Sequence, residues 1–159
     1  ADGVDILKQS AAKDVLIMSV GSMASTALQV AELLSAQGIG ATVIDPRWVV
    51  PVPKSVVTMS AEHRLMVTIE DGIKVGGIGT RVRQDLREAQ VDTALTEIGL
   101  PDEFIDHATR NQILEDTGLT AQAIARDIVA QVVGSRVPHA RSVDGSATSS
   151  DATKPSTIS

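Results

Sequence analysis

The chain has 159 residues, of which 43% are hydrophobic and 21% charged, a composition typical of one globular domain. The absence of cysteine excludes disulfides and thiolate metal sites. A net charge of −6 and an aromatic content of 1% argue against a nucleic-acid partner, because the field repels phosphates and few rings are available for stacking. No apolar run reaches the roughly 18 residues of a membrane span, and the acidic N-terminus is unlike a signal peptide, so we expect a cytoplasmic protein without membrane contact.

The composition changes near residue 134. Residues 135–159 are dominated by Ser, Thr, Ala, Asp and Pro with little apolar spacing. Because such a segment has little to bury, we expect a disordered tail, with an arm ordered against a partner as the alternative. The expected folded domain is therefore residues 1–134.

Two short β-prone runs open the chain, Val4–Gln9 and Asp14–Val20. The short polar link between them is compatible with an antiparallel hairpin. The second run is almost continuously apolar, which indicates a central strand that is covered on both faces.

A helix is expected after Gly21, where apolar residues recur at helical spacing, with Ser22 as its N-cap and Gly38 as its stop. A third strand follows over Ala41–Asp45. A short helix then has Pro53 in its first turn.

The second half of the chain continues the alternation of strands and helices. In chain order we expect a strand at Arg64–Glu70, a helix from Ile78 to about Gln90, a strand at Ala94–Ile98, a short helix at Arg110–Thr117 and a last helix capped by Thr120. This alternation predicts an α/β fold of three layers, α/β/α, with a five-stranded, mostly parallel sheet and an antiparallel first strand.

Ligands of open α/β sheets bind beyond the carboxyl ends of the strands, and charged residues gather there: Asp45, Arg47, Glu70 and Asp71. Neighbours on a strand point to opposite faces, so Glu70 and Asp71 are poorly placed as an acid/base pair. We expect a solvated rim or an ion pair with Arg47. The alternative is that one carboxylate projects across an interface.

His107 lies in a loop with the only phenylalanine, near Arg110, and we expect packing or an interface hydrogen bond rather than catalysis. The three histidines are far apart in sequence, so no metal site is expected. The turn at Gly21 and the glycines at 72, 76, 77 and 79 lack the dinucleotide fingerprint and a Walker lysine. Close backbone approach and positive-φ turns explain those four glycines, or the loop lies flat against another subunit.

The order of motifs is more specific than any single one. It resembles the C-terminal domain of the 1-deoxy-D-xylulose-5-phosphate synthase family, a transketolase-like group, from about Val4 to Val133. The segments that carry the resemblance are Asp45-Pro46-Arg47-Trp48, Ile69-Glu70-Asp71-Gly72, Leu100-Pro101-Asp102-Glu103-Phe104 and Gly118-Leu119-Thr120-Ala121.

The resemblance implies a parent homodimer that uses thiamine diphosphate and Mg²⁺ to condense pyruvate with glyceraldehyde 3-phosphate, with loss of carbon dioxide. The product feeds isoprenoid, thiamine and pyridoxal synthesis. In this family the coenzyme, metal and substrate motifs belong to the N-terminal and middle domains, and none of them matches this chain. The resemblance therefore implies a structural, dimer-supporting domain with no catalytic, cofactor or metal residue of its own.

Two other functions remain open from the sequence. The chain could be the equivalent domain of a 2-oxoacid dehydrogenase β subunit, which docks an acyltransferase core. It could also be a free-standing nucleotide-binding domain.

Overall fold

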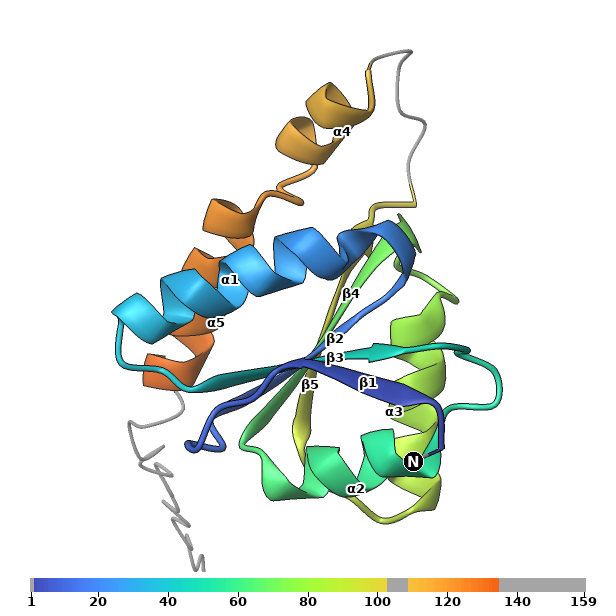
Figure 1. Cartoon of the computed structure of the whole chain (residues 1–159). Helices are drawn as coiled ribbons and strands as arrows, with labels where there is room; N and C mark the ends of the chain where they lie inside the picture. Colours follow the sequence, from blue (N-terminus) through green and yellow to red (C-terminus); the bar gives the residue numbers. More distant parts are fainter. Residues whose placement is uncertain (1, 103–108, 135–159) are drawn as a thin grey trace, which may run out of the picture.

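A computed structural model describes residues 2–102 and 109–134. Its five strands form one sheet in the order β1-β3-β2-β4-β5, and helices cover both faces (Figure 1). The elements are β1 (Val4–Lys8), β2 (Val15–Ser19), the 3₁₀ turn η1 (Gly21–Met23), α1 (Ala24–Ala36), β3 (Ala41–Pro46), α2 (Lys54–Glu62), β4 (Leu65–Ile73), α3 (Ile78–Glu88), β5 (Ala94–Leu100), α4 (Arg110–Asp116) and α5 (Ala121–Gly134).

The first strand is antiparallel and the other four are parallel, as predicted. The expected hairpin is wrong, however, because β1 pairs with β3 and not with β2. All five residues of β2 are buried, and parallel neighbours, β3 and β4, occupy both of its edges. With no edge of β2 free, the first strand is displaced to the outer side of β3.

The sheet separates two apolar cores, which confirms the expected three layers. One core lies under α1 and α5 and includes Val30, Ile124 and Ile128, packed against the sheet residues Ile17 and Val67. The other lies under α2 and α3, where the contributing side chains include Val56, Val82, Leu86, Leu16 and Met66. Strand residues thus alternate between the two cores, as the period of two requires.

The helix ends largely follow the expected turn chemistry. Gly38 and Gly118 both have a φ of +72°, the left-handed conformation that ends a helix. Thr120 Oγ1 accepts a hydrogen bond from the amide of Ala123 at 3.3 Å, so it caps α5 as expected. Ser22 is not an N-cap, since it lies inside η1 and α1 has no side-chain cap.

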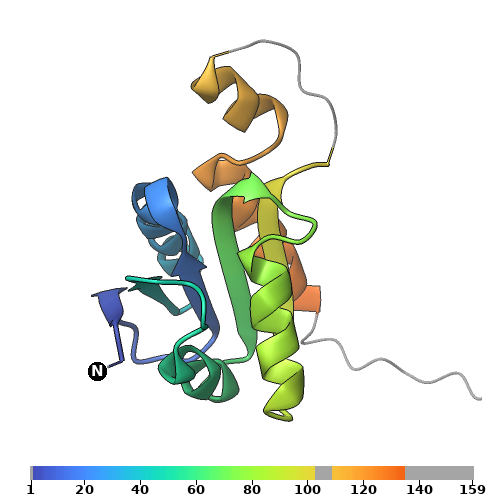
Figure 2. The ribbon, with the colours of Figure 1, turned by 90° about the vertical axis from the view of Figure 1, so that its right-hand side faces the viewer.

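Strands β4 and β5 run past their predicted ends, to Ile73 and Leu100. After a register shift that follows Ile69, Ile73 pairs with Leu100, and the amide of Lys74 donates to the carbonyl of Leu100 at 2.8 Å. The two strands therefore form a short ribbon beyond the sheet. Helix α4 also lies beyond the carboxyl end of β4, apart from the two helical layers (Figures 1 and 2).

Within the described ranges, no helix is both long and apolar enough to cross a membrane. The predicted tail, residues 135–159, lies outside the described residues, so its expected disorder stays a prediction.

Candidate functional site

The loops at the carboxyl ends of β3 and β4 come together on one side of the molecule. Figure 2 turns this side to the viewer, with the loop after β3 in teal and the loop after β4 in green. Because β1 is antiparallel, its first residue, Val4, pairs with Pro46 at the end of β3. The start of the chain and the carboxyl-end loops therefore share one face, which we call the rim face.

Glu70 is the most buried charged residue of this face, with 6% of its surface exposed. Its carboxylate accepts hydrogen bonds from the backbone amides of Ile78 and Gly79, both at 3.1 Å. Ile78 and Gly79 are the first two residues of α3. The N-cap position of this helix is Gly77, which has no side chain that could accept these hydrogen bonds. Glu70 thus caps α3 from the neighbouring strand, where its charge also complements the helix dipole.

Asp71, the next residue, is exposed and turns to another element. Its Oδ2 accepts a hydrogen bond of 3.0 Å from the hydroxyl of Ser22 in η1. The two adjacent carboxylates therefore serve different elements, as the alternation along a strand predicts. Glu70 is not part of a solvated rim, because it is buried under α3.

The expected ion pair between Arg47 and the carboxylates of β4 is wrong. Arg47 instead binds Asp5 of β1 in two contacts, Nε to Oδ2 at 3.0 Å and Nη2 to Oδ1 at 2.8 Å. The hydrogen bonds from Arg47 hold the pKa of Asp5 below its usual value. Sheet register explains the choice, since Asp5 pairs with Asp45, two residues before Arg47.

Asp45 is half-buried and lies beside Asp5, its partner across the sheet. Partial burial, and next the negative charge of Asp5, raise the pKa of Asp45 above its usual value. The carboxylate is thus held in an unfavourable environment, which costs stability once it is ionised.

His107 and Arg110 are the remaining expected site residues. His107 lies outside the described residues, and Arg110 begins α4, with the placement of its side chain likewise outside them. His63, the residue after α2, is buried, and its Nδ1 donates to the carbonyl oxygen of Met59 at 2.7 Å.

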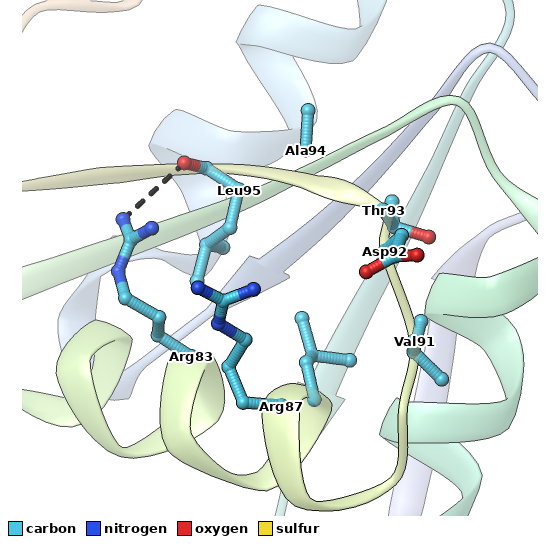
Figure 3. Close-up of a pocket in the computed structure, with 8 residues that line it drawn as sticks. Arg83, Arg87, Val91, Asp92, Thr93, Ala94 and Leu95 are labelled. Carbon is cyan, nitrogen blue, oxygen red and sulfur yellow. Dashed lines mark hydrogen bonds between the residues drawn. The ribbon is translucent and has the colours of Figure 1, made fainter.

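A hollow of about 290 Å³ lies at the opposite end of the sheet, where α3 ends and β5 begins. Arg83 and Arg87 extend from α3 across Leu95 of β5, while Asp92 and Thr93 form the far wall (Figure 3). Arg83 binds Glu97 at 2.9 Å and the carbonyl of Leu95 at 3.4 Å. This face of α3 is thus ion-paired, and it includes the pair of Arg81 with Asp85 at 3.6 Å, one helical turn apart.

The rim carboxylates do not fit a magnesium diphosphate site. Glu70 is committed to backbone amides and Asp5 to a guanidinium. In the described part of the chain, no group of three His, Asp or Glu side chains is arranged to hold a metal ion. That the chain alone binds neither thiamine diphosphate nor Mg²⁺ stays a prediction.

Comparison with known proteins identifies the family to which this fold belongs. Residues 4–124 match the family described as Transketolase, C-terminal domain, and the chain belongs to this family. Within it, the chain is similar to 1-deoxy-D-xylulose-5-phosphate synthases, as its motifs predicted. It is 71% identical over 140 residues to those of Clavibacter sepedonicus and Leifsonia xyli, across 88% of this chain and 22% of each relative. The chain thus spans less than a quarter of the length of these curated relatives.

Solved structures agree on the fold. A protein described as a split gene transketolase, inactive beta4 tetramer, superposes with a TM-score of 0.74 at 29% identity, over 84% of this chain and 43% of that one. A transketolase variant from Pichia stipitis has a TM-score of 0.63 at 17% identity, over 85% of this chain and 18% of that one, a likeness in fold alone.

Proposed function

We propose that this chain is the C-terminal domain of a 1-deoxy-D-xylulose-5-phosphate synthase and supports the packing of its active-site domains. The observation that carries the proposal is the 71% identity over 140 residues to synthases of which the chain covers only 22%. The reaction of the parent enzyme joins pyruvate to glyceraldehyde 3-phosphate with loss of carbon dioxide. Thiamine diphosphate and Mg²⁺ supply the carbanion chemistry when bound to that enzyme.

The role of this domain in the proposal is structural. Two carboxylates of the rim are used inside the domain, Glu70 to cap α3 and Asp71 to bind Ser22 of η1. Homodimerisation, a cytoplasmic location and contact with the N-terminal and middle domains belong to the same proposal. The curated relatives favour a synthase over a 2-oxoacid dehydrogenase β subunit. A nucleotide-binding role has no comparable support, since Ser22 at the turn in question donates to Asp71.

Deletion of this domain from its parent enzyme tests the proposal. The deleted enzyme and the full-length enzyme are compared for deoxyxylulose phosphate formation and for mass in solution. We expect the deletion to abolish or strongly reduce turnover and to disturb assembly. Full turnover by the deleted enzyme, with unchanged mass, would contradict a supporting role.

A further inference from the structure

The rim face exposes large apolar side chains on two loops. Four of the eight exposed large hydrophobic residues in the described part of the chain lie there, at the end of β4 or on the loops after β3 and β4: Trp48 (48% exposed), Val50 (65%), Ile73 (52%) and Val75 (71%). Exposed apolar groups gathered on one side of a domain mark an interaction surface.

The loop after β4 is held in place by contacts on both sides. The amide of Lys74 donates to the carbonyl of Leu100, and the amide of Gly77 donates to the carbonyl of Lys74 at 3.3 Å. Glu70 anchors the start of α3 immediately after the loop. The apolar side chains of Ile73 and Val75 are therefore presented by a backbone that is already ordered, which lowers the entropic cost of docking.

The loop after β3 is anchored to the start of the chain. The ring of Trp48 lies against Gly3, where no space is left for a side chain, and the amide of Arg47 donates to the carbonyl of Gly3 at 2.8 Å. The carboxylate of Asp2 accepts hydrogen bonds from the amide and the hydroxyl of Ser55, at 2.9 and 2.6 Å. The chain thus enters the domain at the rim face.

We propose that the rim face docks against the domains that precede this one in its own enzyme, with Ile73 and Val75 as the principal apolar contacts. This inference rests on the proposed function. Two observations select the occupant. The polypeptide before a C-terminal domain joins it at Asp2 and Gly3, beside Trp48, and most of the length of the relatives lies outside the matched region. A second copy of this domain is the competing occupant.

Cysteine labelling in the full-length enzyme tests whether the face is covered. The domain has no cysteine of its own, so a thiol introduced by Ile73→Cys, Val75→Cys or Val133→Cys is identified by its peptide mass. Val133 on α5 is a matched control, because it and Ile73 are both 52% exposed. Each rate is divided by the rate of the same variant in denaturant. We expect the two rim thiols to react roughly tenfold or more slowly than the control. Equal rates would overturn the proposal.

A photo-crosslinking amino acid in place of Val75 then identifies the occupant. Adducts with peptides of the preceding domains support the proposal, and adducts with a second copy of this domain overturn it. If the proposed function is wrong, the result is different, because the enzyme that lacks this domain then forms product at the normal rate. If the docking face alone is wrong, the deletion still abolishes turnover while the rim thiols label freely.

Discussion

The carboxylate of Glu70 fills the space that a side chain at Gly77 would need. A Cβ atom at Gly77 would lie 2.5 Å from Oε1 of Glu70 and 2.6 Å from the carbonyl oxygen of Ile73. The φ of Gly77 is −72°, which any residue can adopt, so the requirement for glycine is steric. The capping of α3 and the shape of the loop before it therefore depend on one another.

Replacing this glycine is expected to be costly. Gly77→Ala should destabilise the domain by about 1–3 kcal/mol, because either the carboxylate or the loop backbone must move. Gly72→Ala, near the end of β4, is the matched control, since its Cβ would meet Oε2 of Glu70 at 3.5 Å, an ordinary contact. Urea unfolding of both variants measures the difference in stability. Equal midpoints would show that the carboxylate of Glu70 and the loop backbone do not constrain Gly77.

Glu70→Gln tests the cap itself. An amide can accept one of the two backbone hydrogen bonds but presents an NH₂ group to the other donor, and it removes the charge at the helix N-terminus. We expect a loss of about 1–2 kcal/mol in the free energy of unfolding. The control Glu88→Gln, near the exposed end of α3, should change stability by less than about 0.5 kcal/mol. If Glu88→Gln lowered the free energy of unfolding as much as Glu70→Gln, the cap by Glu70 would make no specific contribution to stability.

Asp45→Asn tests the strained carboxylate beside Asp5. Because the pKa of Asp45 is raised in the folded state, the native domain binds its proton more tightly than the unfolded chain does. Ionisation therefore costs stability as pH rises from the usual aspartate value through the raised pKa. The variant should be more stable than the parent chain at pH 7 by less than about 1 kcal/mol, with the gain fading below about pH 4.

Unfolding curves of the variant and the parent chain at pH 7 and below about pH 4 check this expectation. Asp92→Asn, on an exposed loop at the opposite end of the sheet, provides the comparison. A gain that persists unchanged at low pH would mean that asparagine acts by packing and not by removing a charge.

The pair of Arg83 with Glu97, which is open to water on the side of the arginine, should contribute little. Arg83 is about half exposed, so a double-mutant cycle with Arg83→Ala and Glu97→Ala should give a coupling of about 0.2–1 kcal/mol that weakens in high salt. A larger coupling free energy that does not change with salt would show that the hollow beside β5 shields this ion pair from water.

Local patterns predicted the elements well and their long-range contacts poorly. The buried run of β2, the glycines that end helices and the cap at Thr120 depend on neighbouring residues, and each was predictable. The partner of β1 was not, because the antiparallel hairpin and the observed pairing with β3 both satisfy its short sequence pattern.

The site shows the same contrast between local patterns and long-range contacts. Asp71 and Ser22 are 49 residues apart, and no local rule connects them. Glu70 could have been anticipated as a cap, since the N-cap position of α3 is a glycine and the first amides of the helix need an acceptor from elsewhere. The choice of Asp5 by Arg47 required the strand order, which the sequence left open.

We propose that this domain supports an enzyme whose chemistry takes place in other domains. This role is tested most directly by incubating the purified chain with pyruvate, glyceraldehyde 3-phosphate, thiamine diphosphate and Mg²⁺, and measuring deoxyxylulose phosphate. We expect no product above the blank, while the full-length enzyme under the same conditions forms it. Product that increases in proportion to the amount of this chain would contradict the account.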